Sequence, residues 1–380
     1  MKIKYLIFGM LCGTVLSSVS ANAFDTKAKY ALLMDSDTGY VMLNKDADVA
    51  MPPASMSKLM TAYLIFEQLK SGKITEDTEF SVSENAWRKG GVKSGSSTMF
   101  LKPGERVKIK DLLRGIIVQS GNDACIVAAE GIAGSEDVFA DIMTRKAKEL
   151  GLKNSTFKNA TGLPQTGHEM SSFDLAKLAR ALIHDFPEYY SIYSEKEFKY
   201  NGIKQGNRNP LLYEVSGADG LKTGHTQASG FGLTGSVKTT DGRRLIMVIN
   251  GLKSMADRRE ESKRLIGWGM GSFENITMYH QKDIVDEVPV WLGVVKTVPL
   301  TVSKDLTVTV PKGAEPDIKA EIHYKTPVQA PIFKGQKLGS IIVHGPDNQN
   351  KSADLIAASD AAKVGYFGKL KAVVLSWFGK

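Results

Sequence analysis

The sequence predicts an α+β protein in which a mixed domain is followed by a small all-β domain. Two β-type runs, 30–34 and 40–43, flank a turn-rich loop and indicate a hairpin near the N-terminus. Apolar helical segments follow, and three strand-like runs over 220–250 return the chain to β structure. Strands at both ends with helices between them favour one antiparallel sheet. Helical periodicity disappears over 284–344, which indicates a separate all-β domain. Its short strands, separated by turn residues, suggest a sandwich-like arrangement.

Helix-capping residues and turn residues mark the expected boundaries of the helices and strands. Gly151 suits the end of one helix, and Ser171 suits the start of the next. The expected helices are 55–71, 111–119, 124–132, 135–150, 171–183 and 255–267. The expected later strands are 220–226, 230–237, 243–250, 288–291, 298–302, 306–310, 319–324 and 339–343. We expect mostly loop and short strand over 73–108.

Four segments are expected along the chain. Residues 1–23 have a lysine-containing start, an apolar run and the small-x-small triplet Ala21-Asn22-Ala23, which is typical of a secretory leader cleaved after Ala23. The mixed domain is expected over 24–280 and the β domain over 281–350. The remaining residues, 351–380, are expected to form an amphipathic helix.

Composition and charge limit the kinds of partner and cofactor that the chain is expected to bind. The chain has 380 residues, 24% of them charged, and a net charge of +8. The basic residues are spread, and no zinc-finger spacing or aromatic RNA-binding motif occurs, so nucleic acid is not an expected partner. Loss of the leader leaves Cys125 as the single cysteine, in an apolar context that favours a buried side chain. We expect no disulfide, no metal and no cofactor.

The C-terminal segment has the pattern of an interfacial helix. Phe367, Leu370, Val374, Trp377 and Phe378 fall near one helix face, with lysines off that face. The apolar stretch is shorter than the ~20 residues that span a bilayer. The sequence therefore predicts that 366–380 lies on the inner-membrane surface, the alternative being a helix docked on its own protein.

The stretch Pro52–Lys58 places a serine and a lysine at the start of an apolar helix. Its two prolines end the preceding segment, and Leu59 to Leu69 are mostly apolar helix formers. Because positions i and i+3 share a helix face, the hydroxyl of Ser55 and the amine of Lys58 are expected side by side. Such a pair can supply a nucleophile and its base without a histidine.

Taken alone, this pair is equally compatible with a helix cap followed by a lysine whose stem covers apolar surface. A second serine-x-x-lysine, Ser155–Lys158, lies in a polar stretch, and we interpret it as chance. Two further motifs favour the catalytic interpretation. Ser120-Gly121-Asn122 interrupts an apolar helical stretch, and Lys222-Thr223-Gly224 lies on a predicted strand, where a glycine often marks close approach of a ligand or backbone.

The order Ser-x-x-Lys, Ser-x-Asn, Lys-Thr-Gly resembles that of serine penicillin-recognising enzymes. The likeness extends to four stretches, Leu101–Gly104, Gln119–Cys125, Asn207–Asn209 and Gly220–Thr226. On these residues the chain resembles low-molecular-mass penicillin-binding proteins, the D-alanyl-D-alanine carboxypeptidases of the Gram-negative periplasm. The resemblance covers nearly the whole chain. It implies a β-lactamase/transpeptidase-like catalytic domain, removal of the terminal D-alanine from peptidoglycan stem pentapeptides, and acylation by β-lactams.

The reacting groups follow from the motifs and the resemblance. Ser55 attacks the peptide carbonyl, and Lys58 takes its proton, which requires a lysine pKa well below ~10.4. The resemblance implies that Ser120 bridges Lys58 and Lys222 and passes the proton to the leaving amine. It implies that Asn122 holds the substrate amide.

The remaining site residues are expected to stabilise the oxyanion, to bind the substrate's terminal carboxylate or to support the site. The resemblance places the oxyanion hole at the backbone N–H groups of Ser55 and His225. Lys222, Thr223 and Arg208 are candidates to bind the terminal carboxylate, with Gly224 beside them. Arg258 is expected to support the site from the following helix by resemblance only.

Three alternatives remain open at this point. A class A β-lactamase would carry Ser-Asp-Asn where this chain has Gly121, and a glutamate for deacylation, for which Glu169 is the candidate. An endopeptidase would cleave peptidoglycan crosslinks with the same site. A membrane-attached scaffold with an inactive site is the non-enzymatic alternative.

Overall fold

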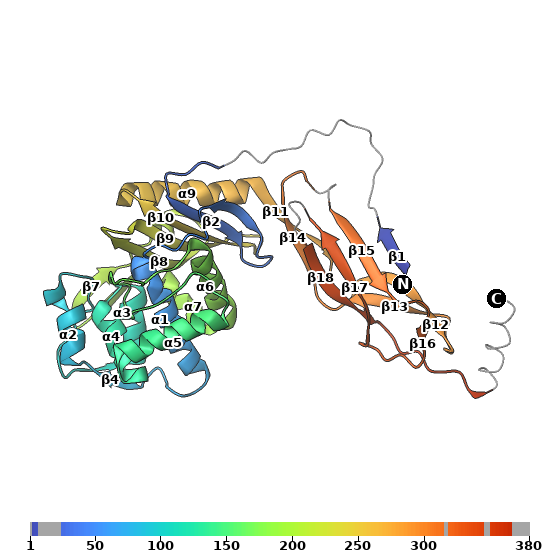
Figure 1. Ribbon diagram of the computed structural model, residues 1–380, viewed down its shortest axis with the longest axis horizontal. Coiled ribbons are helices and arrows are strands. Elements are labelled where there is room, and N and C mark those ends of the chain that lie inside the picture. The colour runs from blue at the N-terminus through green and yellow to red at the C-terminus, as the bar shows by residue number, and fades with distance from the viewer. Residues whose placement is uncertain (1, 7–23, 315–317, 346–349, 367–380) are drawn as a thin grey trace. The chain divides into compact units, whose positions relative to one another are not determined.

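The computed structural model of the chain describes residues 2–6, 24–314, 318–345 and 350–366. They belong to two compact units, Ala23–Gly271 and Ser272–Lys380 with Met1–Asn22. We call the first the mixed unit and the second the β unit. Figure 1 shows the mixed unit as a sheet covered by helices and the β unit as strands.

The mixed unit is built on a five-stranded antiparallel sheet with the strand order β3-β2-β10-β9-β8. The predicted N-terminal hairpin and the predicted three later strands are therefore confirmed, and they form one sheet. Strand β8 lies at the sheet edge. The strands are β2 (Tyr30–Asp35), β3 (Val41–Lys45), β8 (Ala218–Thr226), β9 (Gly230–Lys238) and β10 (Arg244–Leu252).

Helices cover both faces of this sheet, because its central strand alternates its apolar side chains. On β10, Ile246 and Val248 belong to the core that contains α1, α3, α4, α5 and α6, whereas Leu245 and Met247 pack in the core that contains Leu265 of α9. Figure 1 shows α9 on one face and the other helices on the opposite face. These helices are α1 (Lys58–Lys70), α3 (Ile109–Ile117), α4 (Asn122–Ala133), α5 (Glu136–Glu149), α6 (Ser172–Asp185) and α9 (Met255–Ser272).

Short elements complete the mixed unit, and several were not predicted. Helix α2 (Glu84–Gly90) lies in the stretch expected to be loop and strand, where Ser83 caps it by accepting a hydrogen bond from the N–H of Ala86. The other short elements are η1 (Ala54–Ser57), β4 (Glu79–Ser81), η2 (Val92–Ser94), β5 (Arg106–Lys108), α7 (Pro187–Tyr190), η3 (Ser191–Ser194), β6 (Glu197–Tyr200), β7 (Ile203–Gly206) and α8 (Leu211–Glu214).

The β unit contains a seven-stranded sheet, β1-β15-β17-β18-β13-β12-β16, and the pair β11–β14. Its core is made of alternating residues such as Val298, Leu300 and Val302. The all-β character predicted from the sequence is confirmed. The strands are β1 (Lys2–Leu6), β11 (Phe273–Tyr279), β12 (Ile284–Trp291), β13 (Thr297–Val302), β14 (Leu306–Pro311), β15 (Lys319–Tyr324), β16 (Val328–Gln329), β17 (Lys337–His344) and β18 (Asn350–Ala357).

Two terminal segments differ from the sequence expectation. The sequence predicts a C-terminal helix from residue 351, but Asn350–Ala357 forms strand β18. The alternating buried residues of β18 complete the sheet. The predicted helix face at 367–378 lies outside the described residues. Lys2–Leu6, within the predicted leader, forms β1 along the edge of β15. Across the described ranges, no helix has both the length and the apolarity to cross a membrane.

Helix α2 packs so closely on the start of α4 that only glycine fits at the contact. A Cβ atom built on Gly90 would lie 2.2 Å from the backbone nitrogen of Asp123 and 2.5 Å from the carbonyl carbon of Asn122. Both obstacles are backbone atoms, which cannot rotate away. In helix α9, by contrast, a Cβ on Gly267 would meet nothing within 4 Å.

We expect Gly90→Ala to lower the free energy of unfolding by about 1–3 kcal/mol, because the added methyl overpacks a backbone contact. Gly267→Ala is the matched control and is expected to raise it by up to about 1 kcal/mol, because alanine is the better helix former. Urea unfolding followed by tryptophan fluorescence measures both. Equal effects at the two positions would contradict the packing argument.

Candidate active site

Ser55 lies in a tight turn that leads into α1. The turn is the 3₁₀ segment η1, so α1 begins at Lys58, three residues later than a helix starting at Ser55 would. In a 3₁₀ turn, side chains at i and i+3 eclipse each other, which brings Ser55 and Lys58 closer than an α-helix does. The amine Nζ of Lys58 lies 3.0 Å from Oγ of Ser55. Ser55 is partly exposed, so a substrate can reach it.

Lys58 is buried, with 1% of its side chain exposed, and its amine has three oxygen neighbours. Besides Ser55, Nζ donates to Oδ1 of Asn122 at 2.7 Å and to the backbone carbonyl of Thr161. Burial lowers the pKa of Lys58 to about 8, with a further lowering from the Arg208 guanidinium. This matches the sequence argument that the lysine must lose its proton easily.

The second motif lies where α3 gives way to α4. Ser120 is 2% exposed, in a left-handed backbone conformation with φ of 60°, and Asn122 is the first residue of α4. Both polar atoms of the Asn122 side-chain amide form hydrogen bonds. Oδ1 accepts from the amine of Lys58, and Nδ2 donates to Oγ of Ser96 at 2.8 Å. No hydrogen bond joins Ser120 to Lys58 or Lys222 among the described residues, so the implied bridge is not formed here.

Asp123 fixes the loop that faces this motif. Its buried carboxylate accepts hydrogen bonds from the Thr98 hydroxyl at 2.6 Å and from the backbone N–H groups of Met99 and Leu101 at 2.8 and 3.1 Å. A carboxylate that receives several donors organises a loop strongly. The same loop carries Ser96, the partner of Asn122, so Asp123 is a positioning residue for the site.

A second loop supplies the carbonyl that holds Lys58. Oδ1 of Asn159 accepts hydrogen bonds from the backbone N–H groups of Thr161 and Gly162, at 3.1 and 2.8 Å. Gly162 has a φ of 80°, and a Cβ on it would lie 2.0 Å from the carbonyl oxygen of Ala54. The loop therefore rests against the Ser55 turn only because residue 162 is glycine.

The third motif lies on the edge strand β8. Lys222 and Thr223 are buried, at 3% and 7% exposed. A Cβ on Gly224 would lie 2.9 Å from the carbonyl oxygen of Pro53 and 3.2 Å from Cβ of Ala54. The glycine thus lets β8 approach the Ser55 turn closely, as the strand-glycine argument anticipated.

His225 and Arg208 lie at the surface of the site. The exposed ring of His225 stacks on Phe231, with 3.8 Å between ring centroids, and no hydrogen bond joins it to Ser55 within the described chain. It is therefore not arranged as a triad base. Arg208 is exposed and donates from Nη1 to Oγ of Ser97 at 2.6 Å.

Four cationic side chains act on one another here. Burial is the largest cause that lowers the pKa of Lys222 well below its usual value, and Lys58, Arg208 and Arg258 lower it further. Arg258 is 7% exposed and lies over the ring of Phe231, at 5.8 Å from the centroid. Burial and Arg208 together lower its pKa to about 10. Such a cluster of cations favours an anionic ligand.

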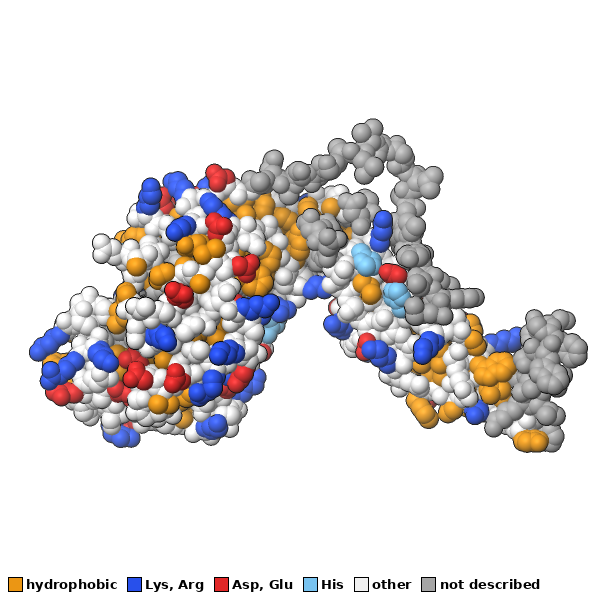
Figure 2. All heavy atoms as spheres, in the orientation of Figure 1, with side chains coloured by type: hydrophobic (Ala, Val, Ile, Leu, Met, Phe, Trp, Pro, Cys, Tyr) orange, Lys and Arg blue, Asp and Glu red, His pale blue; other side chains and the backbone are white. Residues whose placement is uncertain are grey.

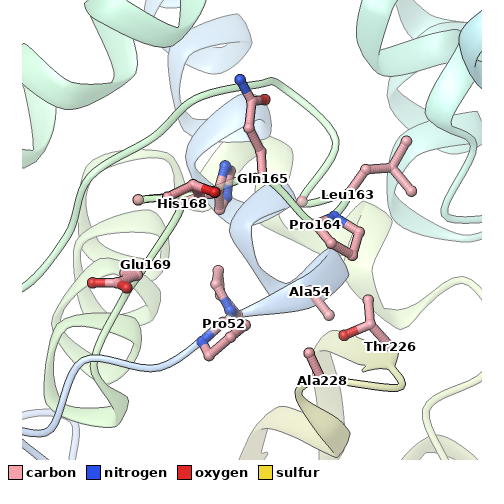
Figure 3. A pocket seen from close by; sticks show the side chains of 13 residues that line it. Pro52, Ala54, Leu163, Pro164, Gln165, His168, Glu169, Thr226 and Ala228 are labelled. Atoms are coloured by element: carbon pink, nitrogen blue, oxygen red, sulfur yellow. The ribbon is translucent and has the colours of Figure 1, made fainter.

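A cavity of about 440 Å³ adjoins the Ser55 turn. Its walls come from residues 52–54, the loop 162–169, Thr226 and Ala228. Figure 3 shows Pro52 and Ala54 between Glu169 on one side and Thr226 and Ala228 on the other. Glu169 is exposed at the far wall from Ala54 and has no hydrogen bond to Ser55 or Lys58 in the described structure. It does not occupy the place of a deacylating glutamate.

Two other sequence interpretations can be compared with the structure. The hydroxyl of Ser155, in the second serine-x-x-lysine, donates to Asp174 at 2.8 Å and serves a loop, as the polar context indicated. Cys125 is fully buried, and burial raises the pKa of its thiol to about 12, so it is an unreactive core residue.

Sequence reasoning missed the supporting residues Ser96, Asp123, Asn159 and Thr161. Asp123 directly follows Asn122 within the stretch Gln119–Cys125, and this position is the only signal that the sequence offers for it. The other residues lie in polar loops, and nothing in their spacing relates them to Ser55.

Comparison with known proteins identifies the family of this chain. Residues 17–254 match the family described as D-alanyl-D-alanine carboxypeptidase, and 273–363 match the C-terminal domain of penicillin-binding protein 5. The chain is 38% identical over 388 residues to D-alanyl-D-alanine carboxypeptidase DacA of Escherichia coli K12, covering 97% of this chain and 96% of the relative.

Two solved structures are similar in fold. Penicillin binding protein 5 from Haemophilus influenzae has a TM-score of 0.80 and 36% identity, with 89% of this chain and 98% of that one covered. Penicillin-binding protein D2 from Listeria monocytogenes, in a cefotaxime-bound form, has a TM-score of 0.59 and 26% identity, with 65% and 98% covered.

The fold and these similarities define a serine hydrolase of the penicillin-binding class. Within that class, the chain belongs to the D-alanyl-D-alanine carboxypeptidase family. The fold class, the family and the activity that the three motifs predicted are confirmed.

We expect Gly224→Ala to slow acylation by benzylpenicillin by about 100-fold, because its methyl pushes β8 away from Ser55 by a fraction of an ångström or more. Stopped-flow measurement of acylation tests this, and Gly267→Ala should leave the rate unchanged. An unaltered rate in Gly224→Ala would show that the close approach of β8 is not required.

Proposed function

We propose that this chain removes the terminal D-alanine from peptidoglycan stem pentapeptides through an acyl-enzyme on Ser55. The observation that carries the proposal is the Lys58 amine, buried and 3.0 Å from the serine hydroxyl. In the first step, the Ser55 oxygen bonds to the carbonyl carbon between the two D-alanines, and the C–N bond breaks. In the second step, water cleaves the ester and releases the shortened peptide.

The neighbours of Lys58 suit it to the role of base. A neutral amine has two N–H groups and one lone pair. When both N–H groups point at the carbonyl oxygens of Asn122 and Thr161, the lone pair is left for the hydroxyl of Ser55. With a pKa of about 8, roughly a tenth of the molecules carry a neutral Lys58 at pH 7.

The proton then has to reach the departing D-alanine amine. Ser120 is the proposed carrier, since its hydroxyl can accept a proton while it gives its own away. Its burial beside Asn122 supports this role. No hydrogen bond joins Ser120 to either lysine among the described residues, and we propose that this bridge forms when substrate binds, as catalytic hydrogen bonds often do.

The substrate's terminal carboxylate is proposed to bind among Lys222, Thr223 and Arg208. The mutual lowering of pKa among the cations supports this, because a carboxylate placed there would relieve their repulsion. Asn122 is proposed to exchange its hydrogen bond with Ser96 for one to the substrate amide.

The backbone N–H groups of Ser55 and His225 are proposed to hold the oxyanion. Their support is the close approach of β8 to the Ser55 turn at Gly224. Losing one such donor typically costs ~2.7–4 kcal/mol of transition-state stabilisation.

The same site is proposed to be acylated by β-lactams, whose strained amide stands in for the D-alanyl peptide bond. The cefotaxime-bound form of the Listeria relative supports this proposal. The position of Glu169 gives no support to rapid hydrolysis of the adduct. Cleavage of crosslinks by the same groups stays a prediction.

We propose that the exported chain begins at Phe24 in the periplasm and is attached to the outer face of the inner membrane through 366–380. The leader pattern supports the export, and the apolar helix face of the tail, with lysines off that face, supports the attachment.

We expect Ser55→Ala to release no D-alanine from a stem pentapeptide and to take up no penicillin, because the hydroxyl is the nucleophile. The matched control is Ser155→Ala, which alters the other serine-x-x-lysine and should keep both reactions. Mass spectrometry locates the penicillin adduct, and an amino-acid assay measures the D-alanine. Adduct on any serine other than Ser55 would refute the assignment.

The pH dependence of acylation should report the Lys58 amine. Because the neutral form is the base, we expect the rate to rise about tenfold per pH unit below pH 8 and to level above it. Lys58→Arg should be inactive at every pH, since a guanidinium stays protonated. Stopped-flow acylation by benzylpenicillin from pH 6 to 9 measures this, and a flat profile would contradict a lysine base.

A further inference from the structure

Three loops meet at one end of the β unit. Strand β12 is antiparallel to β13, and β13 is antiparallel to β18, so β12 and β18 run the same way, and β16 is parallel to β12. The chain therefore leaves these strands at the same end of the sheet, and it does so through 291–296, 330–334 and 361–366. We call these three segments the apolar tip.

Backbone hydrogen bonds hold the tip together. The Val294 N–H donates to the carbonyl of Ala362, and the Val364 N–H donates to that of Leu292, both at 2.9 Å. Ile332 exchanges backbone bonds with Ala361, at 2.9 and 3.0 Å. The segment 361–364 thus lies between the other two, and backbone hydrogen bonds join all three segments into one surface.

The tip exposes large apolar side chains from all three segments. Val294 is 68% exposed, Phe333 is 65% exposed and Tyr366 is 77% exposed. Trp291 and Val295 are partly exposed beside them, at 37% and 42%. Figure 2 shows hydrophobic side chains gathered with basic ones at one end of the β unit. Side chains of this size on one surface mark an interaction site.

Charge at the tip is mainly positive. Lys296, Lys334 and Lys363 are all exposed. The one acidic residue within 360–366 is Asp360, which accepts a hydrogen bond from the Lys334 N–H at 2.7 Å. Apolar and aromatic side chains surrounded by lysines are the combination that suits the interface of an anionic bilayer.

We propose that the apolar tip inserts into the surface of an anionic lipid bilayer, as a second membrane contact of the β unit beside the C-terminal segment. The inference rests on the proposed membrane attachment. From Tyr366 the chain continues directly into 367–380, whose sequence combines three lysines with aromatic and aliphatic residues, so attachment of that segment brings the tip to the same surface. Two weak contacts on one body then act together.

The positive charge favours lipid over a second copy of this chain. Two tips face to face would bring six lysines together, whereas an anionic leaflet attracts each by about 1 kcal/mol. Single contacts of this kind bind reversibly, which explains why a tip of a few side chains needs the tail as its partner.

The test places one fluorophore on the tip of the exported chain, from Phe24 to Lys380. Val294→Cys carries an environment-sensitive dye, and buried Cys125 does not react. Ile284→Cys is the matched control, because Ile284 is 67% exposed and begins β12, whereas the tip begins where that strand ends, at Trp291. The strand separates Ile284 from Trp291 by about 23 Å. The probe is vesicles of phosphatidylglycerol and phosphatidylethanolamine.

We expect the dye at 294 to shift to the blue and to be quenched by spin-labelled lipid, and the dye at 284 to show neither. Sedimentation of the protein with vesicles while neither dye responds would overturn the tip contact and leave the tail contact standing. No sedimentation at all would overturn both. A response at 294 that needs concentrated protein and no vesicles would assign the tip to a second copy instead.

A second variant measures the strength of the contact. The double substitution Val294→Ser with Phe333→Ser removes exposed apolar groups only, so folding is preserved. We expect vesicle affinity to fall about tenfold or more, with release of D-alanine from a soluble pentapeptide unchanged. Unchanged vesicle affinity would overturn the proposal.

Discussion

The site depends on one buried amine, that of Lys58, which is held by the side-chain oxygen of Asn122 and the backbone oxygen of Thr161. The described structure does not arrange His225 to take the proton of Ser55, since its ring stacks on Phe231. Lys58 is usable because burial removes the hydration that normally stabilises its charge, while Asn122 and Thr161 fix its orientation. The same burial that costs a charged lysine free energy therefore suits Lys58 to its proposed role as a base near neutral pH.

Three separate parts of the chain have to converge for this arrangement to exist, and glycines allow them to do so. Gly162 brings the Thr161 loop onto the Ser55 turn, and Gly224 brings the edge strand β8 to the same turn. Gly90 lets α2 pack on the backbone at Asn122. A side chain at any of these positions would separate elements whose side chains must meet within hydrogen-bonding distance.

The sequence predicted the sheet and its main helices because their apolar residues recur with a clear period. It pointed to the site because three motifs, each weak alone, occur in the family order. It predicted neither carbonyl oxygen that accepts from Lys58. The family resemblance assigns Asn122 to the substrate amide, and the Thr161 contribution is a backbone carbonyl that no residue type encodes. The sequence also does not predict α2, a short polar helix without an apolar stripe. It assigns 351–357 to the terminal helix, although the alternating apolar residues there form strand β18. Contacts between distant loops, such as Ser96 with Asn122, follow only from the fold.

The most direct test is an NMR titration of the Lys58 amine itself, using lysine labelled with ¹³C at Cε in the exported chain and assigned by Lys58→Arg. The account predicts that one lysine signal titrates with a pKa of about 8 and disappears in that variant. A Lys58 signal that titrates near the ordinary lysine value of ~10.4 would mean that the amine stays charged, and the proposed base would have to be abandoned.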